Sequence, residues 1–137
     1  MCIFCKIVEG SVPAYKVYED GTVLAFLDLT QGTHGHTLVI PKNHISNVYE
    51  MSEETASQLF SKVPLIARAL KKALNPVGLN IVNNNDQPLQ TVFHAHIHLI
   101  PRYPDDGMIL STRNRIEEYQ PEDYQTLAKE INHYVRT

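Results

Sequence analysis

The sequence predicts an α+β fold in which roughly five antiparallel strands pack against one long helix, with a second helix at the C-terminus. Two observations favour this class. Short β-branched and aromatic runs occur before residue 41 and again after residue 78, and a stretch with helical periodicity separates them. With 137 residues, 43% of them hydrophobic, the chain is long enough to bury a core and fits one domain over 1–137.

The first three strands are predicted before residue 41. Residues 16–20 and 22–28 flank Asp20-Gly21, and Asp-Gly is a strong signal for a two-residue β-hairpin. Residues 36–40 predict a third strand, which Pro41 ends because proline cannot donate to a sheet ladder. Glycines in the preceding loop would allow the backbone to approach a ligand closely.

The predicted core helix begins after Ser52, a favourable N-cap residue, and continues to Leu74. Apolar residues recur along it at the three- and four-residue spacing of an amphipathic helix, and Asn75-Pro76 ends it. Pro64 lies inside this stretch and removes one backbone hydrogen bond. We therefore expect one helix bent at Pro64 rather than two helices.

Two more strands are predicted at 79–82 and 92–100, separated by a polar loop. A final helix is expected from Pro121, which suits a first helical turn, to about Tyr134. Together with the earlier elements, these complete the five strands and two helices.

Charge and the N-terminus exclude several classes of protein. The chain has 12 Lys and Arg against 15 Asp and Glu, a formal charge of −3, so it lacks the basic field of a nucleic-acid binder. The N-terminus reaches Lys6 without an apolar stretch long enough for a signal peptide or membrane span. We expect a cytoplasmic protein that binds neither a nucleic-acid polymer nor a membrane.

Three histidines alternate with apolar residues in His94-Ala95-His96-Ile97-His98. On a regular strand, alternation would place all three imidazoles on one face and the apolar side chains on the other. A single metal bound by the whole row is geometrically poor, because His94 and His98 would lie roughly 13 Å apart at about 3.3 Å per residue. A phosphate opposite the middle ring fits better, because His96 could attack phosphorus while its neighbours contact oxygen atoms.

The only two cysteines form Cys2-x-x-Cys5. In a reducing compartment this spacing suggests half of a metal site or a redox pair before it suggests a structural disulfide. Zinc would need two further nitrogen or sulfur ligands from elsewhere in the chain.

The chain resembles the histidine triad (HIT) family, in the nucleotide-binding and hydrolase branch that begins with a Cys-x-x-Cys. The resemblance is carried by four segments, namely 2–7, Ala25-Phe26-Leu27-Asp28, 35–42, and 90–98 with its histidine run. It implies the histidine triad fold and catalytic roles for His36, His94, His96 and His98, with His96 as the nucleophile. It also implies nucleotide contacts by Asp28, Asn83, Asn84, Gln90 and Thr91.

The resemblance further implies a homodimer that binds a small-molecule nucleotide, with purines preferred. The reaction would split nucleoside phosphoramidates or related conjugates at the α-phosphate through a nucleotidyl-histidine intermediate. Uridylyltransferase relatives carry glutamine where this chain has His98, so His98 favours hydrolysis. Two alternatives remain open at this stage: a dinucleoside polyphosphate hydrolase using the same site, and a nucleotide-binding adaptor with little turnover. The Asp86-Gln87-Pro88-Leu89 loop replaces a glycine-rich segment of relatives, which puts backbone contacts to the phosphate in doubt.

The resemblance also completes the zinc site, because relatives with the Cys-x-x-Cys add two histidines that correspond to His44 and His94. A structural zinc held by Cys2, Cys5, His44 and His94 is therefore expected, with no organic cofactor. The two remaining histidines, His34 and His133, are predicted to face solvent.

Overall fold

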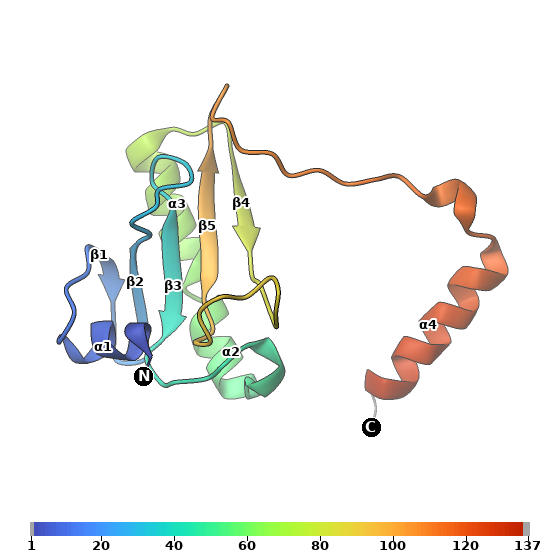
Figure 1. Cartoon of the computed structure of the whole chain (residues 1–137), viewed down its shortest axis with the longest axis horizontal. Helices are drawn as coiled ribbons and strands as arrows, with labels where there is room; N and C mark the ends of the chain where they lie inside the picture. The colour runs from blue at the N-terminus through green and yellow to red at the C-terminus, as the bar shows by residue number, and fades with distance from the viewer. Residues whose placement is uncertain (1, 136–137) are drawn as a thin grey trace.

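Five antiparallel strands form one sheet in the order β1-β2-β3-β5-β4 in the computed structural model, which describes residues 2–135 (Figure 1). The strands span Lys16–Glu19, Val23–Leu27, Thr37–Pro41, Gly78–Val82 and Ile97–Arg102, numbered β1 to β5 in chain order. The helices are α1 (Ile3–Glu9), α2 (Glu53–Phe60), α3 (Val63–Leu74) and α4 (Pro121–Val135). The predicted α+β class and the five-stranded antiparallel sheet are confirmed.

The sheet is covered differently on its two faces. One apolar cluster joins the sheet to α2 and α3, and its buried members include Val39, Leu59, Ile66, Ile97 and Leu99. On the other face, the short helix α1 places Phe4 and Ile7 against Leu24, Phe26, Leu38 and Ile40. This second face carries the histidines described below, because Leu38 lies directly opposite His98 in the pairing of β3 with β5.

Several local predictions are confirmed. The turn at Asp20-Gly21 joins β1 to β2, as predicted. Its loop has three residues, and Asp20 Oδ1 stabilises it by accepting hydrogen bonds from the amides of Thr22 and Val23. The Ser52 hydroxyl accepts from the amide of Thr55 and caps α2. The C-terminal helix extends from Pro121 to Val135.

The prediction of a single bent helix is wrong. The segment forms two helices, α2 and α3, with Ser61 and Lys62 between them. Pro64 lies in the first turn of α3, where its missing N–H removes no hydrogen bond. The proline therefore begins a helix instead of bending one.

The prediction of a strand over 92–100 is also wrong at its start, because β5 begins only at Ile97. The amide of Ala95 donates to the carbonyl of Ile45 in a loop, at 2.7 Å, rather than to a neighbouring strand. Two of the three alternating histidines therefore precede the strand, and the alternation does not fix their directions.

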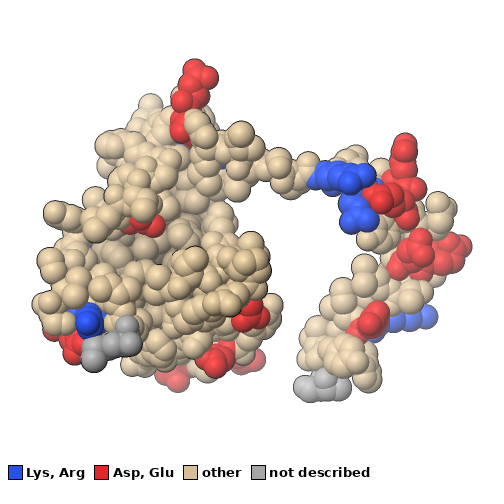
Figure 2. All heavy atoms as spheres, viewed as in Figure 1, with Lys and Arg blue, Asp and Glu red and all other residues tan. Residues whose placement is uncertain are grey.

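The C-terminal segment leaves the sheet as an extended arm that ends in α4 (Figure 1). In the view of Figure 2, open space separates α4 from the part of the molecule that contains the sheet. None of the residues of α4 is buried. Within residues 2–135, no helix is both long and apolar enough to cross a membrane.

Gly35 is a position where the fold requires glycine. Its φ is +93°, and a Cβ added there would lie 2.3 Å from Cδ1 of Leu74 and 3.3 Å from Cγ of Pro101. We expect Gly35→Ala to lower the free energy of unfolding by about 2 kcal/mol, measured by urea denaturation. Gly21→Ala is the matched control, because an added Cβ there meets nothing within 4 Å. Equal stability of the two variants would contradict this account.

Candidate active site

Two histidines meet where β3 begins and β5 passes beside it. The β3–β5 pairing brings His36, just before β3, next to His98 on β5, with ring centroids 5.2 Å apart. His96 lies beside His98 at 5.0 Å between centroids. Three imidazoles therefore form a chain, but they come from two separate segments of the sequence.

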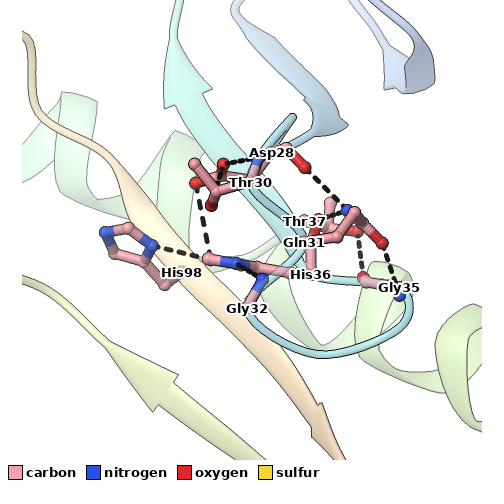
Figure 3. A network of polar contacts seen from close by, with 8 residues as sticks. All are labelled: Asp28, Thr30, Gln31, Gly32, Gly35, His36, Thr37 and His98. Atoms are coloured by element: carbon pink, nitrogen blue, oxygen red, sulfur yellow. Dashed lines mark hydrogen bonds and ion pairs between the residues drawn. The ribbon is translucent and has the colours of Figure 1, made fainter.

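Hydrogen bonds assign the tautomers of this pair. The amide of Gly32 donates to Nδ1 of His36 at 3.2 Å, so that nitrogen carries the lone pair of the neutral ring. Nε2 of His36 then carries the proton and donates to Nδ1 of His98 at 2.9 Å. The remaining proton of neutral His98 is therefore on Nε2, and this nitrogen points away from the network (Figure 3). His98 presents an N–H donor to whatever lies beyond it.

Asp28 borders the same pair. Its Oδ1 accepts from the amide and the hydroxyl of Thr30, at 2.9 and 2.7 Å, which fixes the carboxylate (Figure 3). Its Oδ2 lies 3.6 Å from Nε2 of His36. A positive charge on the His36–His98 pair would therefore have a carboxylate beside it.

His96 is oriented by a backbone carbonyl. Its Nδ1 donates to the oxygen of His94 at 2.7 Å, which leaves the lone pair on Nε2. The ring of Phe4 packs edge-on against His96 with centroids 5.2 Å apart. The side-chain amide Nδ2 of Asn83 donates to the carbonyl of His96 at 3.0 Å, so ring and backbone are both held.

The ring of His94 contacts Phe4 on the α1 side of the sheet, as the ring of His96 does, but its nitrogen atoms bind other groups. Nε2 of His94 donates to the carbonyl of Pro41 at 2.7 Å. Its Nδ1 faces the two sulfur atoms, 3.4 Å from Sγ of Cys2 and 3.6 Å from Sγ of Cys5. Nδ1 of His44 lies 3.3 Å from Sγ of Cys5. We call Cys2, Cys5, His44 and His94 the cysteine cluster.

The cysteine cluster fits a tetrahedral zinc ion. All four ligand atoms lie within 4.8 Å of one another. With Zn–S near 2.3 Å and Zn–N near 2.0 Å, tetrahedral ligand atoms are about 3.3 to 3.8 Å apart, as the N–S pairs here are. The bond from His94 to Pro41 is the outer contact that metal-bound histidines commonly make. The group predicted from sequence is thus brought together.

Burial dominates the electrostatics. Burial first, and then the neighbouring His96 and His36, lower the pKa of His98, while Asp28 opposes them, and the net pKa is about 4. Burial likewise lowers the pKa values of His36 and His94. Burial alone would raise the pKa of Asp28, but hydrogen bonds from Thr30 outweigh it and the pKa is lowered. At neutral pH the free site therefore holds the neutral His36–His98 pair beside one carboxylate.

An apolar cavity of about 340 Å³ opens beside these residues. Phe4 and Ile7 of α1 form one wall, Phe26 and Leu38 of the sheet form another, and Asp28 lies at the lining too. Because Phe4 contacts both the cavity and His96, the cavity adjoins the candidate nucleophile.

The other predicted nucleotide contacts are placed less centrally. Gln90 is 2% exposed, and its side-chain amide bonds to the carbonyls of Ser46 and Val92. Thr91 is exposed and lines a separate hollow with Cys2 and His44. Asn84 is half-buried, and its contact with a nucleotide stays a prediction. His34 and His133 are exposed, as predicted.

The sequence reasoning missed Phe4, Thr30 and Gly32 as parts of the site. Thr30 and Gly32 act through local hydrogen bonds to Asp28 and His36. Asp28-x-Thr30 resembles a side-chain-capped turn, so the spacing was a usable signal for Thr30. Nothing local distinguishes Phe4 from an ordinary core residue.

Comparison with known proteins gives consistent matches. A family model described as HIT domain matches residues 9–105. Protein hit of Bacillus subtilis is 53% identical over 132 residues, covering 95% of this chain and 91% of that protein. Adenosine 5'-monophosphoramidase of Schizosaccharomyces pombe is 36% identical over 136 residues, covering 98% of each.

Solved structures agree. A HIT family protein from Bacillus anthracis superposes with a TM-score of 0.94 at 50% identity, covering 97% of this chain and 96% of that one. A Zn-bound histidine triad family protein from Mycobacterium smegmatis superposes with a TM-score of 0.74 at 39% identity, covering 85% and 86%. A score of 0.94 over nearly the whole chain includes the C-terminal arm, so the arm is placed similarly in the first of these.

The tautomers and the lowered pKa can be measured directly. In a long-range ¹H–¹⁵N spectrum, we expect His98 to carry its proton on Nε2 and to stay neutral until the pH approaches 4. The unfolded chain takes up this proton near pH 6.5. The contribution of His98 to stability is therefore present above about pH 6.5 and is lost as the pH falls toward 4. A His98 ring protonated on Nδ1 at pH 7 would contradict the assignment.

Proposed function

The chain belongs to the HIT family, and we propose that it is a nucleotide hydrolase that attacks the α-phosphorus of nucleoside phosphoramidates or related conjugates through His96. The observation that carries this proposal is the pair of tautomers on His96 and His98. His96 presents a lone pair on Nε2, His98 presents an N–H donor on Nε2, and the two ring centroids are 5.0 Å apart. Attack on phosphorus and contact with a phosphate oxygen need these two functions side by side.

In the first step, Nε2 of His96 forms a bond to phosphorus while the bond from phosphorus to the leaving group breaks. Both ring lone pairs of the His36–His98 pair accept hydrogen bonds. An added proton would therefore enter at Nδ1 of His36 in exchange for the bond from Gly32, and the proton between the rings would shift toward His98. The negative phosphate and Asp28 favour this positive charge. His98 gives its Nε2 proton to the departing amine or alcohol. In the second step, neutral His98 takes a proton from water, and the resulting hydroxide displaces His96 from phosphorus.

The apolar cavity supplies a seat for the nucleoside. Its volume of about 340 Å³ and its aromatic walls from Phe4 and Phe26 suit a stacked base, with purines preferred. Asp28 lines the same cavity and would accept hydrogen bonds from the ribose hydroxyls. The name of the Schizosaccharomyces pombe relative, a monophosphoramidase, supports this substrate class.

We also propose that Cys2, Cys5, His44 and His94 hold a structural zinc ion. The geometry of the ligand atoms fits, and the Mycobacterium smegmatis neighbour is Zn-bound. Bound zinc would keep both thiols deprotonated and would fasten the N-terminus to the sheet.

A homodimer is the third part of the proposal. Tyr124, Leu127, Ile131 and Val135 form a stripe along one side of α4, and each is between 45% and 75% exposed. An isolated helix of 15 residues is marginal in water, so such a stripe needs a covering surface. The arm keeps its placement in the Bacillus anthracis structure, although it makes little contact with its own body. A second copy of the chain would cover it.

The catalytic proposal is tested with a fluorogenic adenosine phosphoramidate. His96→Ala should lower kcat/KM on the order of 10⁴-fold or more, because the nucleophile is lost. His98→Ala should lower it by about 10²- to 10⁴-fold, the range for a proton donor. His34→Ala is the control, because His34 is exposed and outside the site.

Rapid quench of the wild type into alkaline denaturant, where the P–N bond survives, should trap an adenylyl group on the protein, and His96→Ala should trap none. Substantial activity in His96→Ala would rule out the covalent intermediate. Turnover of a diadenosine polyphosphate in parallel decides which leaving group the site prefers.

The dimer is tested by sedimentation equilibrium of Ile131→Glu, with Thr126→Glu as the matched control on the opposite side of α4. Burying a carboxylate in an interface is costly, so the first variant should dissociate at concentrations where the second stays dimeric. Identical masses for the two variants would show that the stripe covers no partner.

A further inference from the structure

The helix α1 belongs to both the cysteine cluster and the nucleoside cavity. We propose that the metal state of the cysteine cluster sets the affinity for nucleotide, with Phe4 as the positioning residue that connects the two. This inference rests on the proposed function and adds a means of regulating the same site.

The two sides of α1 face different sites. Sγ of Cys2 accepts from the amide of Cys5 at 3.3 Å and so caps the helix with a metal-ligand atom. On another side, Phe4 and Ile7 are buried in the apolar cluster that lines the cavity. With seven residues, α1 is too short to be stable alone. Its position depends on these two sets of contacts.

Phe4 connects the sets directly, since it lies between the two cysteines in the sequence. Its ring is 5.9 Å from that of His94 in the cysteine cluster and 5.2 Å from that of His96, both edge-on. It is also 5.5 Å from Phe26 across the cavity wall. A displacement of α1 would therefore change the cavity and the packing of the nucleophile together.

His94 provides a second connection. Its ring nitrogens bond to the sulfur atoms and to Pro41, while its carbonyl accepts the proton of His96 Nδ1. Fixing this residue by a metal ion fixes the carbonyl that orients His96. Both connections start at metal ligands and end at nucleotide-contacting groups.

The experiment measures binding of AMP by isothermal titration calorimetry to zinc-loaded and chelated protein, with zinc content checked by elemental analysis. We expect affinity to fall at least tenfold when zinc is removed and to return when Zn²⁺ is added. Cys5→Ser should bind AMP weakly whether or not Zn²⁺ is present. Phe4→Leu should retain zinc yet bind AMP several-fold more weakly. Glu9→Asp, at an exposed position of α1 and with the charge near Cys5 kept, should match the wild type in both zinc content and AMP affinity.

The ¹⁵N spectrum of His96 gives a reading that is independent of turnover. Removal of zinc should weaken its Nδ1–H bond to His94, whereas a purely structural zinc would leave it unchanged. Equal AMP affinity with and without zinc, or a chain that takes up no zinc, overturns the coupling and leaves the hydrolase proposal standing. If the zinc-loaded protein binds no AMP, the nucleotide site itself is wrong. Circular dichroism of the Phe4→Leu variant separates misfolding from loss of contact.

Discussion

The hydrogen bond from Nδ1 of His96 to the carbonyl of His94, 2.7 Å long, is the contact on which the rest of the site depends. It fixes one tautomer and leaves a single lone pair, on Nε2, available to a ligand. It is available because β5 begins only at Ile97, so the carbonyl of His94 is outside the strand. The same break lets the ring of His94 turn toward the cysteines. The irregular backbone before β5 therefore directs His94 to the cysteine cluster and His96 to the candidate active site.

The tautomer of His98 is also fixed by a backbone group, the amide of Gly32, through His36. The amide of Gly32 can only donate, so it holds the proton of neutral His36 on Nε2, which in turn directs the proton of His98 outward. Burial keeps both rings neutral in the free protein. In the proposed function, Asp28 is the local charge that favours a proton on this pair once a phosphate is bound.

Sequence patterns predicted the sheet, the hairpin, the Ser52 cap and the C-terminal helix, because each depends on local propensity. They failed where long-range contacts decide the structure. Pro64 suits the middle of a bent helix and the start of a new one equally well, and only packing distinguishes these. Alternation predicted a regular strand from residue 92, but the amide of Ala95 bonds to Ile45 in a loop and the strand begins only at Ile97. The cysteine cluster was grouped correctly from resemblance, since ligand identity does not depend on strand register.

The family model matches residues 9–105, while the relatives and solved structures compared above match nearly the whole chain. Asp28, His36, His96 and His98 all lie inside the family match, so the proposed chemistry rests on residues of that segment. The two cysteines and Phe4 lie before it, and α4 lies after it. The N-terminal helix α1 forms a wall of the cavity, and α4 carries an apolar stripe that its own body leaves uncovered. In the proposed function, residues of the matched segment act at the phosphorus atom, while α1 forms a wall of the cavity proposed for the nucleoside.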